Sequence, residues 1–139
     1  MDRDELMKNL ERTMQGTFRA LQKGMNSILG DNINRSEFYL LRFLKENGPA
    51  KVSLISSELK VTASHITAVG DSLVTKGYIE RNRSSEDRRI VELSLSDHGK
   101  QLFNDLNLRR TQYLYSTLDD LTDAEISELI TLFNKFNLG

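Results

Sequence analysis

The stretch from Gly77 to Leu95 constrains the fold of this chain most, because it has the pattern of a β-hairpin with a charged tip. Tyr78 and Ile79 open the first predicted strand. In the second strand apolar residues alternate with Glu and Ser, which is the period-two signature of a half-buried strand. The apolar residues of this second strand are Ile90, Val91, Leu93 and Leu95. The sequence therefore predicts a hairpin that projects from the rest of the fold.

The turn of this hairpin carries three arginines, Arg83, Arg88 and Arg89, together with Asp87. A thin tip that bears arginines can reach a phosphate backbone or enter a minor groove. The Asp87 carboxylate can orient a neighbouring guanidinium by a two-pronged hydrogen bond. For the hairpin taken alone, a solvated turn with a surface ion pair explains the same residues equally well.

Two short helices are predicted just before the hairpin. The first runs from Ser53, a predicted N-cap, to about Lys60, and the second from Thr62 to about Lys76. Gly77 follows where a left-handed residue favours the end of a helix. The second helix has an apolar face made of Ile66, Val69, Gly70 and Leu73. Two short helices joined by a tight turn predict a helix-turn-helix, and the hairpin makes it a winged one.

The opposite face of the second helix is small and polar. Its candidate DNA-contacting residues lie near the helix start: Ser64, His65, Thr67 and Ala68. Small hydroxyls approach bases closely, an imidazole can donate or accept, and an alanine methyl can touch a thymine methyl. An ordinary solvent-facing helix shows the same residue types, so the hairpin indicates DNA binding more strongly than this face does.

Long amphipathic helices are predicted at both ends of the chain. The first runs from Asp4 to about Leu29, a second from Asp97 to about Leu118, and a last helix opens at the capping pattern Thr122 to Glu125. A further capping pattern, residues 34–37, opens the helix before the helix-turn-helix. The two outer stripes are Leu6, Leu10, Met14, Phe18, Leu21, Met25 and Ile28, and Ile126, Leu129, Ile130, Phe133 and Phe136. These stripes predict either a bundle within one chain or a two-fold homodimer, the commonest assembly.

Several motifs resemble those of the MarR family of bacterial winged helix-turn-helix transcription regulators. They are the segment 76–81 (Lys-Gly-Tyr-Ile-Glu-Arg), the Asp87-Arg88-Arg89 tip at the family's distance from the glycine, and the exit Leu95-Ser96-x-x-Gly99. The resemblance implies a mainly α fold with a small β-hairpin wing (α+β). It also implies a single domain over residues 1–139, with the winged helix-turn-helix at about 34–96 and dimerisation helices at about 4–30 and 97–137.

The resemblance further implies a transcription regulator that binds double-stranded DNA as a homodimer at a pseudo-palindromic operator. It implies a repressor that a small-molecule ligand, such as a small aromatic compound, releases from DNA. In the family the ligand lies between the dimerisation helices and the winged helix. In this chain the candidate lining is Phe18, Phe38, Tyr39, Phe43 and Tyr113, which are also plausible core residues. Relatives often carry a long polar residue where this chain has Ala68, so we expect the wing to contribute more of the affinity.

The charge distribution agrees with DNA binding although the formal net charge is only −1. A basic cluster falls in the winged unit, made of Lys76, Arg81, Arg83, Arg88 and Arg89. Acidic residues gather instead near the C-terminus, at Asp119, Asp120, Asp123, Glu125 and Glu128. A locally basic face on a nearly neutral protein is compatible with specific duplex binding.

Other kinds of chemistry find little support in the sequence. The chain has no cysteine, which excludes disulfides, a zinc finger and thiol-based sensing, and it is consistent with a cytoplasmic protein. Neither a signal peptide nor a membrane-spanning run is predicted. His65 and His98 stand apart, and neither a metal, a cofactor nor a nucleophile motif is indicated, so we expect a non-enzyme. The alternative is a winged-helix adaptor that binds proteins, which would not need three arginines on a thin hairpin.

Overall fold

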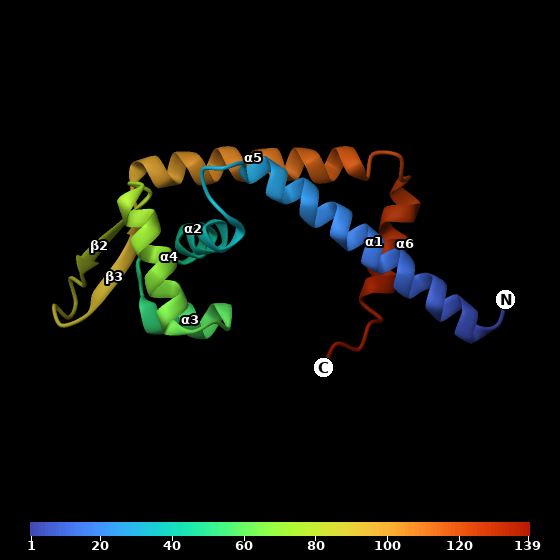
Figure 1. Cartoon of the computed structure of the whole chain (residues 1–139), viewed down its shortest axis with the longest axis horizontal. Helices are drawn as coiled ribbons and strands as arrows, with labels where there is room; N and C mark the ends of the chain where they lie inside the picture. Colours follow the sequence, from blue (N-terminus) through green and yellow to red (C-terminus); the bar gives the residue numbers. More distant parts are fainter.

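A computed structural model describes all 139 residues and contains six helices and three short strands. The elements are α1 (Arg3–Leu29), α2 (Arg35–Asn47), β1 (Ala50–Lys51), α3 (Val52–Leu59), α4 (Ala63–Thr75), β2 (Ile79–Arg83), β3 (Val91–Leu95), α5 (Asp97–Thr117) and α6 (Asp123–Phe133). The winged unit, from α2 to β3, lies at one end of the molecule, and α1 and α6 form an arm at the other end (Figure 1). The long α5 runs along both parts and connects them. The predicted mainly helical fold with a β-hairpin wing is confirmed.

Side-chain caps set the start of most helices. In α2 the Asn34 side chain accepts from the Glu37 amide at 2.8 Å, and the Glu37 carboxylate accepts from the Asn34 amide at 3.0 Å. The same reciprocal pair, a capping box, opens α6 at Thr122 and Glu125. A third capping box opens α1 at Asp2, slightly before the predicted start of that helix.

The predicted N-cap of α3 at Ser53 is wrong. The helix begins at Val52, and Lys51 occupies the N-cap position without any side-chain hydrogen bond. Lys51 belongs to β1, where it pairs with Glu92, so the chain passes directly from a strand into the helix. Ser53 lies within the first turn, and its carbonyl accepts a hydrogen bond from the Ser56 hydroxyl at 3.1 Å.

The wing is a three-stranded antiparallel sheet in the order β1-β3-β2 rather than the hairpin alone. In the hairpin Ile79 pairs with Leu95, and Arg83 pairs with Val91. Ile79 and Leu93 are buried, whereas Val91 is exposed because it lies out toward the tip. The sheet root therefore belongs to the core and the tip projects into solvent.

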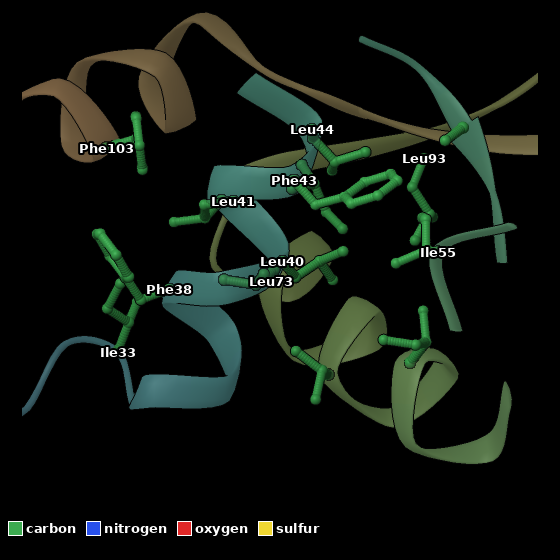
Figure 2. Packing of buried hydrophobic residues seen from close by; sticks show 14 of the residues in the cluster. Ile33, Phe38, Leu40, Leu41, Phe43, Leu44, Ile55, Leu73, Leu93 and Phe103 are labelled. Carbon is green, nitrogen blue, oxygen red and sulfur yellow. The ribbon is translucent and has the colours of Figure 1, made fainter. Parts of the chain in front are cut away.

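The hydrophobic core centres on α2 and fixes the orientation of α4. Figure 2 shows Leu40 and Leu41 of α2 among residues from α4, the sheet and α5. Leu73 of α4 is fully buried, and the Phe38 ring stacks on Phe103 of α5 with their centroids 5.4 Å apart. One face of α4 is therefore held inside the core while the opposite face is left for solvent.

Two glycines bring α5 close to the rest of the chain. A Cβ at Gly99 would overlap the carbonyl group of Tyr78, so α5 starts in direct contact with the root of the wing. Further along α5, the Tyr113 ring lies against Gly24 of α1, where a Cβ would overlap the ring. No helix in the structure combines the length and apolar character that crossing a membrane requires.

Candidate nucleic-acid interface

The first turns of α4 expose the predicted base-contacting residues. Thr62 caps the helix by accepting a hydrogen bond from the His65 amide at 3.0 Å. The candidate side chains Ser64, His65, Thr67 and Ala68 are all exposed and come from adjacent turns of one helix. The buried face packs tightly, since a Cβ at Gly70 would lie 3.3 Å from a Leu93 methyl. Residues of this size present a smooth surface that can approach base edges closely.

At the tip of the wing, Asp87 orients Arg89. The Asp87 carboxylate accepts from Arg89 Nε at 3.0 Å and from Arg89 Nη2 at 2.9 Å, and one of its oxygens also accepts from the Arg89 backbone amide at 3.0 Å. The hydrogen bonds from Arg89 hold the pKa of the Asp87 carboxyl below its usual value. The Arg89 side chain nevertheless remains 90% exposed, so its guanidinium is oriented and accessible at once.

Backbone contacts stiffen the same turn. Arg83 Nη1 donates to the Arg88 carbonyl at 2.9 Å, which ties the end of β2 to the tip. Ser84 is buried, its amide donates to the Ile90 carbonyl at 2.8 Å, and its hydroxyl accepts from the Glu86 amide at 3.2 Å. The tip is thus held in shape without DNA, which lowers the ordering cost of binding.

The basic cluster predicted from the sequence divides into two groups. Arg81 is ion-paired with Asp71, which joins β2 to α4, and Lys76 is ion-paired with Glu37. The remaining cations of the cluster, Arg83, Arg88 and Arg89, lie at the wing turn. The cations at the root of the winged unit are therefore paired with carboxylates, as Arg89 is with Asp87 at the tip, whereas Arg83 and Arg88 have no carboxylate partner within the chain.

Glu37 is the residue that sequence reasoning missed. The sequence indicated only its role in the capping box, yet its side chain is buried and contacts Lys76 Nζ at 2.9 Å and the Ser72 hydroxyl at 3.0 Å. Burial alone disfavours its charged form, but hydrogen bonds from Lys76, the Asn34 amide and Ser72 outweigh burial and lower the pKa of Glu37. The separation of about 35 to 39 positions explains why no local pattern revealed these contacts.

The five candidate ligand-contacting aromatics do not share one cavity. Phe38 and Tyr39 line a cavity of about 240 Å³ between α1, α2 and α5, together with Arg35 and Arg110. Phe18 lies instead in the groove between α1 and α6, Phe43 belongs to the core, and Tyr113 packs against Gly24. Arg110 stands 4.7 Å above the Phe38 ring, and burial followed by the charge of Arg42 lowers its pKa.

An apolar groove lies between α1 and α6, the two helices that carry the outer stripes. Its volume is about 460 Å³, and its apolar lining residues are Leu10, Met14, Phe18, Leu129, Leu132, Phe133 and Phe136. Most of these side chains are exposed in the single chain. Exposed apolar surface of this extent is typical of an interaction site.

An exposed second helix beside an arginine-tipped hairpin defines the class of winged helix-turn-helix DNA-binding proteins. The model of the MarR family matches residues 33–91. The HTH-type transcriptional regulator YpoP of Bacillus subtilis is 40% identical over 135 residues, which is 97% of this chain and 96% of that protein. The chain therefore belongs to the MarR family, and it is a DNA-binding transcription regulator rather than an enzyme.

Further relatives agree with this assignment. The HTH-type transcriptional repressor MdtR of Bacillus subtilis is 31% identical over 88% of this chain and 80% of its own length. The crystal structure of the YusO protein from Bacillus subtilis superposes with a TM-score of 0.83 at 28% identity, covering 97% of this chain and 96% of that one. Streptococcus pneumoniae FabT, solved in complex with DNA, shares the fold with a TM-score of 0.80 at 23% identity, covering 92% of each chain.

Proposed function

We propose that this protein is a sequence-specific repressor that binds a pseudo-palindromic operator in double-stranded DNA as a homodimer. The observation that carries the proposal is the wing tip, where Asp87 fixes the direction of an exposed Arg89 guanidinium. The name of the relative MdtR, a transcriptional repressor, supports the direction of regulation, and the FabT–DNA complex supports DNA as the ligand.

In this proposal the two exposed elements have different roles. Arg89 enters the minor groove and Arg88, which makes no side-chain hydrogen bond within the chain, pairs with phosphate. The start of α4 lies in the major groove, where His65 and Thr67 meet base edges. Ala68 offers only a methyl group, so the wing contributes more of the affinity and α4 more of the selectivity.

The groove between α1 and α6 supports the proposed homodimer. The stripes on these helices remain open to solvent in the single chain, and the second copy that a palindromic operator requires would cover them. Two winged units then lie about 34 Å apart, roughly one turn of duplex.

The cavity beside Phe38 and Tyr39 is the candidate site for the small molecule that releases the repressor. Its aromatic lining suits a planar apolar group, and the partly buried Arg110 suits an anionic one. Within the chain Arg110 donates only one long hydrogen bond, of 3.4 Å, to Asn107. A small aromatic anion therefore fits this site best.

Binding to a duplex selected from a randomised pool tests the proposed function directly. We expect the wild-type protein to bind the selected duplex far more tightly than a random one. Arg89→Ala should weaken binding to both and reduce the slope of log K against log salt by about one unit. Thr67→Ala should weaken only specific binding, by about 1–3 kcal/mol. Failure of the wild-type protein to enrich any duplex would refute the proposal and favour the protein-binding adaptor.

A further inference from the structure

A half-buried ion pair joins the end of α4 to the start of α2. The Glu37 side chain is only 4% exposed and contacts Lys76 Nζ at 2.9 Å, and the Lys76 side chain is 36% exposed. Lys76 is the residue at which α4 ends, and Glu37 lies in the first turn of α2. Because α4 is the candidate recognition helix, this contact fixes one end of the element that lies on DNA.

The hydrogen bonds of Lys76 are complete within the chain. Its ammonium group has three donors, and three acceptors lie within range: the Asn32 carbonyl at 2.9 Å and the two Glu37 carboxylate oxygens at 2.9 and 3.2 Å. A phosphate would have to replace one of these partners and leave a buried carboxylate less well compensated. Lys76 therefore differs from Arg88, whose guanidinium has no partner in the chain.

The carboxylate of Glu37 is equally well satisfied, and its three partners come from the start of α2 and the end of α4. It accepts from the Asn34 amide at the start of α2, from the Ser72 hydroxyl in α4 and from Lys76. Through Lys76 it also reaches the Asn32 carbonyl in the connection between α1 and α2. The last turn of α4 is consequently held to the segment that leads into the arm.

We propose that Glu37 and Lys76 are positioning residues that set the angle of α4 on the operator, and that Lys76 makes no phosphate contact. An ion pair with one buried partner adds little net stability because desolvation of that partner offsets the attraction, whereas it does demand one geometry. The core holds α4 along its length through Ile66, Val69 and Leu73, and the Glu37–Lys76 pair adds a directional contact that sets the tilt at the C-terminal end. A small tilt there displaces Thr67 and His65 at the opposite end from the base edges. The inference rests on the proposed role of α4.

The double variant Glu37→Gln/Lys76→Met tests this inference without leaving a buried charge. Glutamine keeps the acceptor for the capping box, methionine is unbranched like lysine and one atom shorter, and the net charge of the protein is unchanged. Lys76→Met alone tests the alternative that Lys76 contacts a phosphate of the DNA. Lys23→Met, at an exposed position of α1 without an ion pair, is the matched control for the loss of a lysine. For each protein the active fraction is measured by stoichiometric titration before affinities are compared.

We expect the double variant to bind the selected duplex about tenfold more weakly and random duplex as tightly as the wild-type protein does. Lys76→Met should leave the salt slope at its wild-type value. A slope reduced by about one unit would show that Lys76 contacts phosphate and would overturn the inference. Equal losses on both duplexes, or no loss on either, would also overturn it, because the pair would then act only on folding or on nothing.

Amide hydrogen exchange in the free protein separates this inference from the proposed function. In the double variant we expect faster exchange in the last turn of α4, near Leu73, and wild-type exchange in α6. Unchanged exchange in α4 would refute the anchoring role whatever the protein binds. If no duplex could be selected but exchange in α4 were faster, the proposed function would be refuted, and with it the effect of the ion pair on DNA binding. The result would still show that the Glu37–Lys76 pair holds the end of α4.

Discussion

We expect the largest effect of a single substitution in the exposed groove between α1 and α6, where it should dissociate the predicted homodimer. Phe133 lies in that groove with 45% of its surface exposed in the single chain. Burying a whole phenylalanine side chain stabilises by up to about 3 kcal/mol, so covering the exposed part contributes roughly 1 kcal/mol. In Phe133→Glu that contribution is lost, and a carboxylate in an apolar groove costs about another 1–2 kcal/mol.

Two-fold symmetry doubles this penalty, because every dimer contains the substitution twice. The total is about 4–6 kcal/mol, which corresponds to an increase of about three to four orders of magnitude in the dimer dissociation constant. Sedimentation at micromolar concentration should therefore show a wild-type dimer and a Phe133→Glu monomer. Circular dichroism should show that both proteins retain their helices.

Leu54→Glu is a matched control for this experiment. Leu54 is 44% exposed on α3, which is nearly the exposure of Phe133, but it lies outside the groove. The Leu54→Glu variant should therefore remain dimeric. The reasoning would be refuted if Leu54→Glu dissociated as readily as Phe133→Glu. It would also be refuted if the wild-type protein sedimented as a monomer and bound a palindromic site without cooperativity.

Three further predictions follow from local contacts. Asp87→Ala should weaken DNA binding although it removes a negative charge, because Arg89 loses its orientation; tighter binding in a fluorescence titration would show that Asp87 only repels phosphate. Gly24→Ala should lower the melting temperature, since a methyl group would force the Tyr113 ring away from α1, and an unchanged melting temperature would contradict this close contact. The lowered pKa of Glu37 stabilises the folded state above the ordinary carboxyl pKa, and this contribution is lost as the pH falls through the folded pKa. Acidification should therefore lower the melting temperature of the wild-type protein more than that of Glu37→Gln, and parallel profiles would contradict that assignment.

Local patterns were sufficient to predict most of the elements of the fold. The capping patterns at Asn34 and Thr122 gave the starts of α2 and α6, and Gly77, with a φ of +82°, ends the turn after α4 as expected. The strand β1 was missed because it has only two residues, which is too short for periodicity to register. Its pairing with β3 is a long-range contact, and it also displaced the predicted start of α3 from Ser53.

The candidate site was predictable only where neighbouring residues interact. Asp87 and Arg89 are two positions apart, so a sequence pattern could suggest that one orients the other. The partners of Glu37 lie in another helix, and burial of a carboxylate has no local signature. The aromatic residues proposed for one ligand cavity lie in separate sites. Amphipathic spacing could not predict this, because it shows that a side chain is covered but not which residues cover it.

The continuous helix α5 connects the arm rigidly to the wing. Its 21 residues span about 31 Å at 1.5 Å per residue. At its start the Ser96 hydroxyl donates to the Gly77 carbonyl at 2.6 Å, and Gly99 lies directly on Tyr78. The wing root is therefore expected to move together with the helix. A rotation of five degrees at the arm would therefore displace the wing root by about 3 Å, calculated from that length. A displacement of this size is comparable to the length of a hydrogen bond, so a change in the arm too small to alter the fold would be enough to remove Arg89 from the minor groove that we propose for it.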